Sequence, residues 1–409
     1  MDTTELTEAR IEDTSNTLVA PSVLQDHDLI RDFFGSTIMP EDLASGSHNL
    51  AQKTVYLCGD ISGISRPQLH AAARVFVIRE LSHGYREDDD HPWTLVHLGR
   101  VPLRVHGVGV YYRRFFGLGA DHFGRIRAEH AFQSLTESTK PGTAHRSGIY
   151  LTPVTRNGDD LHFRLLRCST NLSGPTESFR PTDTDIVEEL NREVATVFRN
   201  QAPLNHVLAQ IYHNTLATAE RKQSKAKISA HADKTKDMPG NGIMAFCTFY
   251  DRLDKLQPLA EDAFDYGVKG TSGLTKLRFR LKEPTGERHG VTLPGQFTVP
   301  LYPGSVFFMP LSTNRLYTHE IRPSTLDAEL LPTRLGYVVR CSSAEAVHKD
   351  GDTFLKTARG LVKLEPPTPA GMDDLRRLYA EENRTSSFID YGDEFLFSMN
   401  TGDYVAPRV

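Results

Sequence analysis

Short apolar stretches separated by turn residues fill the region from 201 to 345. The stretches NHVLAQIY, GSVFFMPL and RLGYVVR have the length and residue types of β-strands, and glycine, proline and polar residues fall between them. Regularly spaced short strands are typical of two-sheet sandwiches and barrels. We therefore expect a mainly β protein with flanking helices, whose core at 201–345 is a double-stranded β-helix of the jelly-roll type.

The segments around this core have weaker patterns. Residues 1–48 are polar and acidic, which predicts a loose segment apart from a short helix near LIRDFF. Residues 49–200 mix strand-like and helix-like stretches and predict an α+β extension or lid. The part near 251–300 is longer than a barrel requires and predicts an inserted hairpin or loop. Residues 346–409 predict a helix, near MDDLRRLYAEEN, and a tail.

Two helices are expected between 49 and 200. The first has Pro67 in its first turn, and its face carries Leu69, Ala73, Phe76 and Glu80. The second begins at Asp185, and its apolar stripe consists of Ile186, Leu190, Val194 and Val197.

The stretch AKISAHADKTKDMP carries the candidate chemistry. His231 and Asp233 stand one residue apart at the end of a strand-like segment, so both side chains can point to the same face. With the distant His319 they form a set of two histidines and one carboxylate, which non-heme Fe(II) oxygenases use because it leaves coordination positions open. Taken alone, His231 and Asp233 also fit a polar pair bonded to the backbone at a strand end.

Two arginines follow His319. Arg334 and Arg340 are six residues apart on a strand-like stretch, and an even offset places both on one face. Two planar guanidinium groups can each hold one carboxylate of a dicarboxylate such as 2-oxoglutarate. The alternative is a pair of solvated strand arginines.

Four segments, NHVLAQIY, AKISAHADK, GSVFFMPLSTNRLYTHEI and RLGYVVR, resemble in order the AlkB family of Fe(II)/2-oxoglutarate dioxygenases, which remove alkyl groups from nucleic acids. The TET and J-base thymine hydroxylases are similar in chemistry. The resemblance implies that His231, Asp233 and His319 hold iron. It further implies that 2-oxoglutarate is held by Arg334, Arg340 and Tyr212, although Tyr212 also fits an ordinary core tyrosine.

The chain departs from the family pattern at several positions. Gln210 stands where the family usually has Asn, and Gly336 and Val338 replace the usual Asn and Thr between the two arginines. Lys234 and Thr235 follow Asp233 where the repair enzymes often have an acidic residue. We therefore expect the cosubstrate pocket and the recognition of the base to differ from the family pattern.

Charge and cysteine content narrow the function only slightly. With 47 Lys+Arg against 52 Asp+Glu the net charge is −5, so contact with nucleic acid requires a local patch. The candidates are Lys225, Lys227 and Lys234, which also fit a solvated loop. Four unpaired cysteines, an N-terminus without a leader pattern and the lack of a long apolar run predict a cytoplasmic or nuclear protein without a membrane partner.

Three functions remain open. The first is an Fe(II)/2-oxoglutarate dioxygenase that hydroxylates or demethylates a modified base, with 2-oxoglutarate, dioxygen and DNA or RNA as partners. The second is the same chemistry on a small molecule or a protein side chain, which the acidic net charge favours. The third is a non-catalytic jelly-roll binding module in which the histidines are structural.

Overall fold

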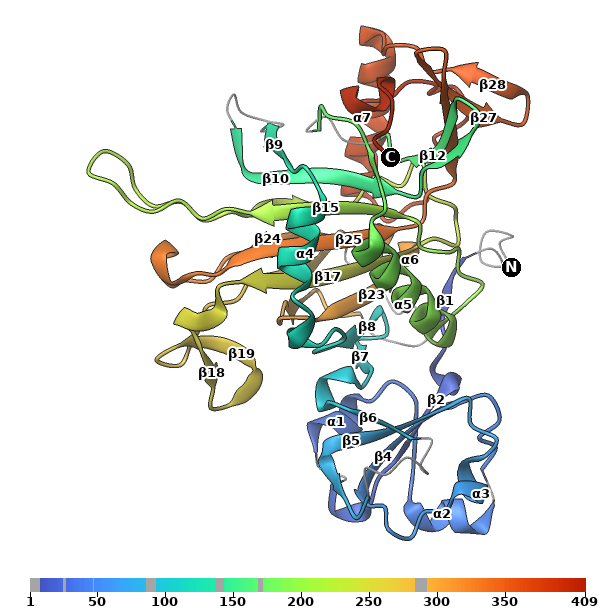
Figure 1. The fold of residues 1–409 in the computed structure, drawn as a ribbon, viewed down its shortest axis with the longest axis vertical. Helices are drawn as coiled ribbons and strands as arrows, with labels where there is room; N and C mark the ends of the chain where they lie inside the picture. The colour runs from blue at the N-terminus through green and yellow to red at the C-terminus, as the bar shows by residue number, and fades with distance from the viewer. Residues whose placement is uncertain are drawn as a thin grey trace.

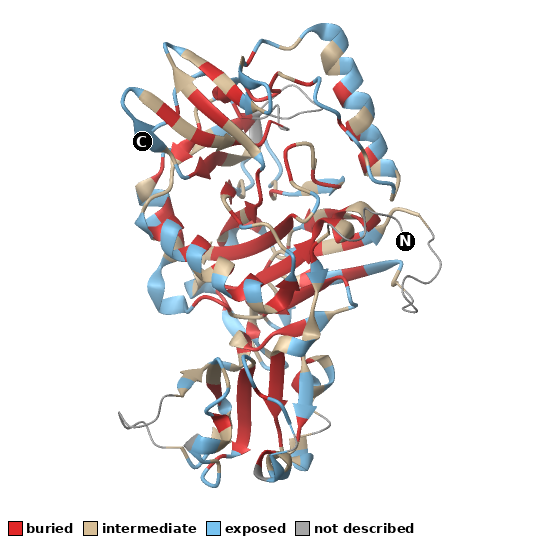
Figure 2. Ribbon diagram, turned by 90° about the vertical axis from the view of Figure 1, so that its right-hand side faces the viewer, coloured by how far each residue is buried: buried red, intermediate tan, exposed pale blue. Residues whose placement is uncertain are grey.

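The computed structural model describes residues 8–24, 27–46, 48–85, 93–136, 143–167, 172–283 and 293–409. Figure 1 shows a small sheet at the N-terminal end, a central β-structure and a C-terminal unit that contains α7 and β27. Buried residues are concentrated in the strands of both the N-terminal and the central sheets (Figure 2). The expectation of a mainly β protein with flanking helices is confirmed.

The main sheet of the central body has nine strands. Its order is β13-β10-β15-β25-β17-β23-β8-β7, with β9 paired to β10. In that order the strands are Glu177–Ser178, Thr143–Thr152, His206–Tyr212, Thr333–Arg340, Ile243–Asp251, Val306–Pro310, Gly109–Tyr112 and Leu103–Val105, with β9 at Gln133–Thr136.

Two helices cover one face of this sheet, α4 (His122–Glu129) and α5 (Pro181–Val197). The apolar stripe of α5 packs against alternate strand residues such as Val207, Tyr337 and Ala245. The helix begins four residues before the expected Asp185, because Pro181 occupies its first turn and Asp183 accepts a hydrogen bond from the main-chain N–H of Arg180 at 2.8 Å. The opposite face of the main sheet is therefore left for the site.

A second sheet of four strands faces the site. Its order is β16-β24-β21-β22, with bounds Ile228–His231, Tyr317–Arg322, Lys276–Leu281 and Gln296–Pro300. From β15 onwards the chain passes back and forth between the two sheets, since β15, β17, β23 and β25 lie in the main sheet and β16, β21, β22 and β24 in the second. One apolar cluster joins them and includes Phe246, Phe279, Phe307 and Tyr317.

The N-terminal region is more ordered than the loose segment that was expected at residues 1–48. Residues 10–100 include a five-stranded parallel sheet of order β3-β2-β4-β5-β6. Its strands are Ser36–Ile38, Asn16–Val19, Thr54–Asp60, Arg74–His83 and Thr94–Val96. Short helices α1 (Asp28–Asp32), α2 (Pro40–Ser45) and α3 (Arg66–Leu69) connect them.

The helix expected after Pro67 is wrong beyond its first turn. α3 ends at Leu69, and Phe76 and Glu80 lie in strand β5. Central strands of a parallel sheet are apolar on both faces, so RVFVIRE gives no period-2 alternation that distinguishes it from a buried helix.

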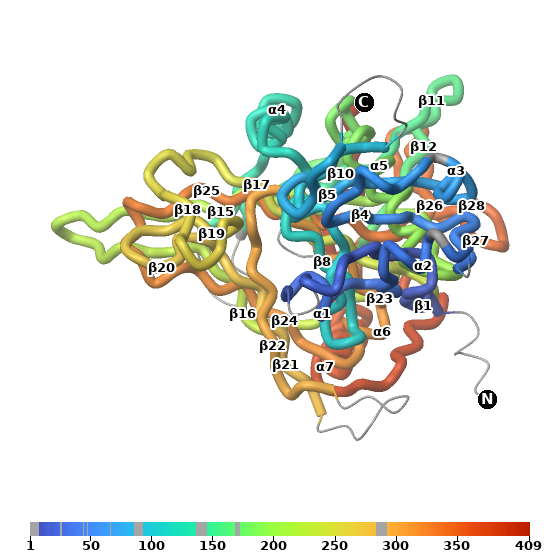
Figure 3. The backbone as a smooth tube through the Cα atoms, turned by 90° about the horizontal axis from the view of Figure 1, so that it is seen from below, coloured from blue at the N-terminus to red at the C-terminus, as the bar shows by residue number. Residues whose placement is uncertain are grey.

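The expected insertion near 251–300 divides into two parts. Strands β18 (Gln257–Leu259), β19 (Asp262–Val268) and β20 (Thr271–Ser272) form a small separate sheet, whereas β21 and β22 belong to the second sheet of the core. The turn 284–292 between β21 and β22 lies outside the described residues. Figure 3 shows β18–β20 and the β27–β28 hairpin at opposite ends of the molecule.

The C-terminal region contributes more than a helix and a tail. Strands β26 (Ala344–Lys349), β27 (Asp352–Thr357) and β28 (Gly360–Lys363) extend a five-stranded sheet that begins with β11 (Thr155–Asn157) and β12 (Asp160–Leu165). The expected helix is α7 (Pro369–Arg384). Among the described residues, the structure contains no helix that is long and apolar enough to span a membrane.

Candidate metal centre and cosubstrate pocket

Three potential metal ligands meet where β16 and β24 pair. His231 ends β16 and lies directly opposite His319 of β24, with ring centroids 4.5 Å apart. Oδ1 of Asp233 lies 3.5 Å from Nε2 of His231 and 3.8 Å from Nε2 of His319. The donor atoms of the three residues all lie within 4.8 Å of one another. The structure thus brings together the three residues that the sequence singled out.

Both histidines can offer a lone pair to this point. Nδ1 of His231 lies 2.9 Å from the main-chain oxygen of Ser229, so Nδ1 carries the proton and Nε2 is available to a cation. Burial, together with the nearby His231, lowers the pKa of His319 to about 3. A neutral imidazole is the form that binds metal.

Arg340 forms an ion pair with the oxygen of Asp233 that faces away from the histidines. Its Nε and Nη2 donate to Oδ2 of Asp233 at 2.9 and 2.6 Å. Burial opposes the ionisation of Asp233, but the adjacent Arg340 guanidinium outweighs it and holds the pKa of Asp233 well below its usual range. Oδ2 is therefore occupied, and Oδ1 is the oxygen turned towards the histidines.

Arg334 is a buried cation without an ion-pair partner among the described residues. It is 4% exposed, its guanidinium lies over the Tyr212 ring with 3.9 Å to the centroid, and its Nε has no hydrogen-bond partner. A buried charge is costly unless it is paired. The arrangement is suited to an anion that enters from the cavity.

Gly336 and Gln210, two positions at which the chain departs from the family pattern, lie in the same pocket. A Cβ at Gly336 would lie 3.0 Å from Nη1 of Arg334 and 3.2 Å from a ring carbon of Tyr212, so glycine leaves room for the arginine to fold over the strand. Gln210 lies opposite Gly336 in the sheet and accepts a hydrogen bond from the Tyr212 hydroxyl at 3.3 Å. Tyr212 therefore lies beside Arg334, and Gln210 lies beside Tyr212.

The metal ligands and both arginines line one cavity of about 530 Å³. Its described lining contains one carboxylate, Asp233, and five cationic side chains, an excess of four (5 − 1). The cations are Arg146, Lys227, Lys234, Arg334 and Arg340. Arg146 lies opposite Tyr212, which lies opposite Arg334, so the three residues are neighbours across three strands of the main sheet, and all three line the cavity. No described residue pairs with Arg146 or with the exposed Lys227.

The three lysines expected to contact nucleic acid lie in different environments. Lys225 donates to the main-chain oxygens of Ser324 and Leu326 at 2.8 and 2.9 Å and does not line the cavity. Lys234 donates to the main-chain oxygen of Tyr379 at 3.1 Å. Of the three, Lys227 alone is exposed at the cavity mouth.

Two further site residues were missed from the sequence. Asn314 of α6 (Leu311–Leu316) is fully buried and pairs with the main chain of Asp233, accepting from its N–H and donating to its C=O, both at 2.9 Å. Arg146 lies on β10, outside every stretch that resembles the family. The alternation in RSGIY could have placed Arg146 on the same face as Gly148 and Tyr150, but no motif marks that strand as part of the site.

No family model and no curated protein matches this chain. Solved structures with partial similarity include the non-heme alpha ketoglutarate dependent epimerase SnoN from nogalamycin biosynthesis, at 13% identity over 59% of this chain and 79% of that one, with a TM-score of 0.32. OsALKBH1 is 12% identical over 57% of this chain and 97% of that one, with a TM-score of 0.32. A Pseudomonas putida prolyl-4-hydroxylase is 11% identical over 54% of this chain and 83% of that one, with a TM-score of 0.27. Similarity at this level does not bear on function, which is argued below from the site.

Proposed function

We propose that this protein is an Fe(II)/2-oxoglutarate-dependent dioxygenase. The observation that carries the proposal is the coincidence, in one cavity, of two histidines and a carboxylate with a buried arginine that lacks an anionic partner among the described residues. A simple metal site has no need of the arginine, whereas a site for a metal-chelating dicarboxylate needs both features.

The residues present fit both groups. His231, His319 and Asp233 would hold iron through two nitrogens and one oxygen, the donor set of the Fe(II) oxygenases. Arg334 would bind the distal carboxylate of 2-oxoglutarate, with Tyr212 and Gln210 beside it, and Arg340 would lie at the metal end of the cosubstrate. Iron with 2-oxoglutarate and dioxygen supplies oxidative cleavage of the cosubstrate to succinate and carbon dioxide and the hydroxylation of a substrate C–H bond. The protein's part is to orient these groups and to exclude water.

The strand arrangement supports a double-stranded β-helix as the scaffold. The chain alternates between the main and the second sheet, and the proposed ligands lie where β16 and β24 meet. Such a two-sheet barrel keeps both strands of the site at fixed separation.

For the substrate we propose a modified nucleic-acid base. Iron and the cosubstrate dianion cancel in charge, so the surplus of cations in the cavity remains after both are bound. Arg146 and Lys227, which no described residue pairs, are available to a phosphate beside a base that has left its stack. A cytoplasmic or nuclear location would give access to such a substrate.

Mass spectrometry of modified nucleosides, after incubation of methylated DNA and RNA with iron, 2-oxoglutarate and the protein, tests this substrate. Loss of a methylated nucleoside that requires 2-oxoglutarate would support it. Succinate formation without any nucleoside change would favour a small anionic molecule or a protein side chain as the substrate. The net charge of −5 also favours this alternative. A chain that binds neither metal nor 2-oxoglutarate would be a binding module.

A further inference from the structure

The end of helix α7 contacts the back of the loop that carries Asp233. Oδ1 of Asn383 accepts a hydrogen bond from the main-chain N–H of Ala232 at 2.7 Å. The buried Glu382 accepts from the main-chain N–H of Thr235 at 3.2 Å and from its hydroxyl at 2.5 Å. Two consecutive residues of a helix that lies outside both sheets of the core therefore hold the main chain on either side of Asp233.

This contact matters because Asp233 lies beyond the last paired residue of β16. The ladder between β16 and β24 ends at His231, so no strand partner fixes the residues that follow. Asn314 fixes the main chain of Asp233 itself, and Asn383 and Glu382 fix its neighbours. The direction of the Asp233 carboxylate depends on this backbone, and a metal site requires its ligands to lie within a few tenths of an ångström of their positions.

The helix side of the contact is itself well supported. Nδ2 of Asn383 donates to the main-chain oxygen of Tyr379 at 3.0 Å, which sets the orientation of the amide. Oε2 of Glu382 accepts from the Tyr391 hydroxyl at 2.5 Å, and the main-chain oxygen of Glu382 accepts from Lys282 at 2.5 Å. Lys234, next to Asp233, donates to Tyr379 and lies over its ring. The acceptors are thus already oriented before any metal binds.

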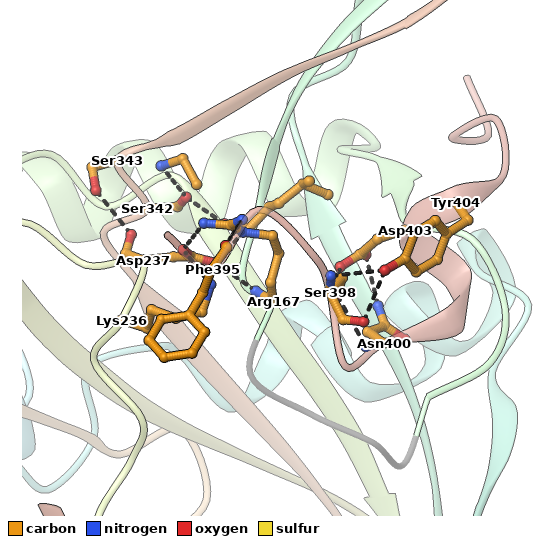
Figure 4. Close-up of polar contacts among 12 residues, drawn as sticks. Arg167, Lys236, Asp237, Ser342, Ser343, Phe395, Ser398, Asn400, Asp403 and Tyr404 are labelled. Carbon is orange, nitrogen blue, oxygen red and sulfur yellow. Dashed lines mark hydrogen bonds and ion pairs between the residues drawn. The ribbon is translucent and has the colours of Figure 1, made fainter. Parts of the chain in front are cut away.

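The far end of the same loop is tied to the C-terminal segment as well (Figure 4). Arg167 is buried, donates to both oxygens of Asp237 at 2.7 to 3.1 Å and donates to the main-chain oxygen of Phe395 at 2.8 Å. One end of the loop from His231 to Asp237 is therefore bonded directly to Asn383, and the other end is joined to Phe395 through Arg167.

We infer that the C-terminal segment is part of the metal site and that Asn383 is a positioning residue, which sets the Asp233 carboxylate for metal binding through the main chain of Ala232. The inference rests on the proposed metal site but names a separate requirement. It predicts that loss of the Asn383 acceptor weakens metal binding more than it weakens the fold.

The test compares Mn(II) binding, by isothermal titration calorimetry, in the full-length protein and four variants. Asn383→Ala and the similarly sized Asn383→Leu remove the acceptor, Asn383→Asp retains it, and Arg384→Ala alters the exposed neighbour as a matched control. The melting temperature of each metal-free protein is recorded to separate a structural effect.

We expect both acceptor-free variants to bind Mn(II) about tenfold more weakly, the lower end of what outer-shell partners of metal ligands contribute. Arg384→Ala should bind close to wild type, and Asn383→Asp, which keeps the acceptor but loses the donor to the main-chain oxygen of Tyr379, should bind more tightly than either acceptor-free variant. If Asn383→Ala fails to fold, the comparison of Mn(II) affinity between Asn383→Leu and Asn383→Asp decides the test. Wild-type Mn(II) affinity in a folded acceptor-free variant overturns the inference alone. Absence of Mn(II) binding by the wild type overturns the proposed metal site, and the inference with it.

Discussion

Arg340 places two hydrogen bonds on one oxygen of Asp233, through Nε at 2.9 Å and Nη2 at 2.6 Å. The other oxygen is left facing His231 and His319. The guanidinium that the sequence predicts to bind the cosubstrate is therefore bonded to a candidate metal ligand. It fixes which carboxylate oxygen is presented and keeps that carboxylate ionised.

Removing this pair should weaken the metal site directly. Arg340→Gln leaves Asp233 buried without its charged partner, so we expect metal affinity to fall about ten- to hundredfold. Because Arg340 lowers the pKa of Asp233, its loss raises that pKa, and protons should compete with metal increasingly as pH falls. Mn(II) titrations at several pH values measure this. Arg340→Lys keeps the charge but loses the planar fork, so its Mn(II) affinity should lie between those of the wild type and Arg340→Gln. Equal Mn(II) affinities in the wild type and both variants would show that Arg340 does not support the metal site.

The cosubstrate site should respond to changes at Arg334 and Gly336. Arg334→Lys keeps the charge but loses the planar fork, so we expect the KM for 2-oxoglutarate to rise about tenfold, equivalent to one charge-assisted hydrogen bond of about 1.5 kcal/mol. Gly336→Ala should raise it as well, because the added methyl group displaces the Arg334 guanidinium. Gly240→Ala is the control, since nothing lies within 4 Å of a Cβ there. Unchanged KM values would place the cosubstrate elsewhere.

The convergence of His231, Asp233 and His319 could be predicted from the four ordered segments taken together, because the His-x-Asp pair alone also fits a polar pair at a strand end. A His-x-Asp pair at a strand end has a fixed geometry, and the later His319 and Arg334 lie on strands that are recognisable by themselves. The supporting residues could not be predicted. The contact of Asn383 with Ala232 spans 151 residues, and that of Arg167 with Phe395 spans 228. Such contacts follow from how whole units pack, which no local pattern encodes.

The first strand of the N-terminal sheet, Asn16–Val19, was missed for a different reason. Asn16–Val19 is a short strand whose four residues are all buried, and it lies in a segment whose average composition is polar. Its apolar residues are too few to raise the average, and a parallel pairing with Thr54–Asp60 is not visible from either segment alone. Composition over a long window therefore concealed an ordered element.

Nucleic-acid binding should depend on Lys227 and Arg146 and not on Lys225. Neutralising Lys227 or Arg146 should reduce the slope of log affinity against log salt for a methylated single strand by roughly 0.7 each. Lys225→Ala should leave the slope unchanged, because its ammonium is bonded to Ser324 and Leu326. Fluorescence anisotropy at increasing salt measures the slopes. An effect of Lys225 equal to that of Lys227 would contradict the assignment.

A buried histidine away from the cavity should make stability depend on pH. Burial opposes protonation of His130, but its hydrogen bonds to Asp183 at 2.7 Å and Glu177 at 3.0 Å outweigh this and raise its pKa to about 9. The raised pKa contributes stability that is complete below the unfolded pKa of about 6.5 and is lost as pH rises through 9, as much as about 3 kcal/mol. Urea unfolding at pH 6.5 to 9.5 should show this fall, and His130→Gln should flatten it. A parallel fall in the variant would assign the effect to other groups.

The proposed function requires that the protein uses metal and 2-oxoglutarate in this cavity. It is tested most directly by measuring succinate formed from 2-oxoglutarate with Fe(II) and dioxygen, in the wild type and in His231→Ala. His231 is the most exposed of the three ligands, with 34% of its side chain accessible, so its loss removes a metal ligand with little effect on the core. The wild type should form succinate in an iron-dependent reaction, and His231→Ala, folded, should form none above background. Succinate formation by the variant at the wild-type rate, or its absence from the iron-loaded wild type, would contradict the proposed function.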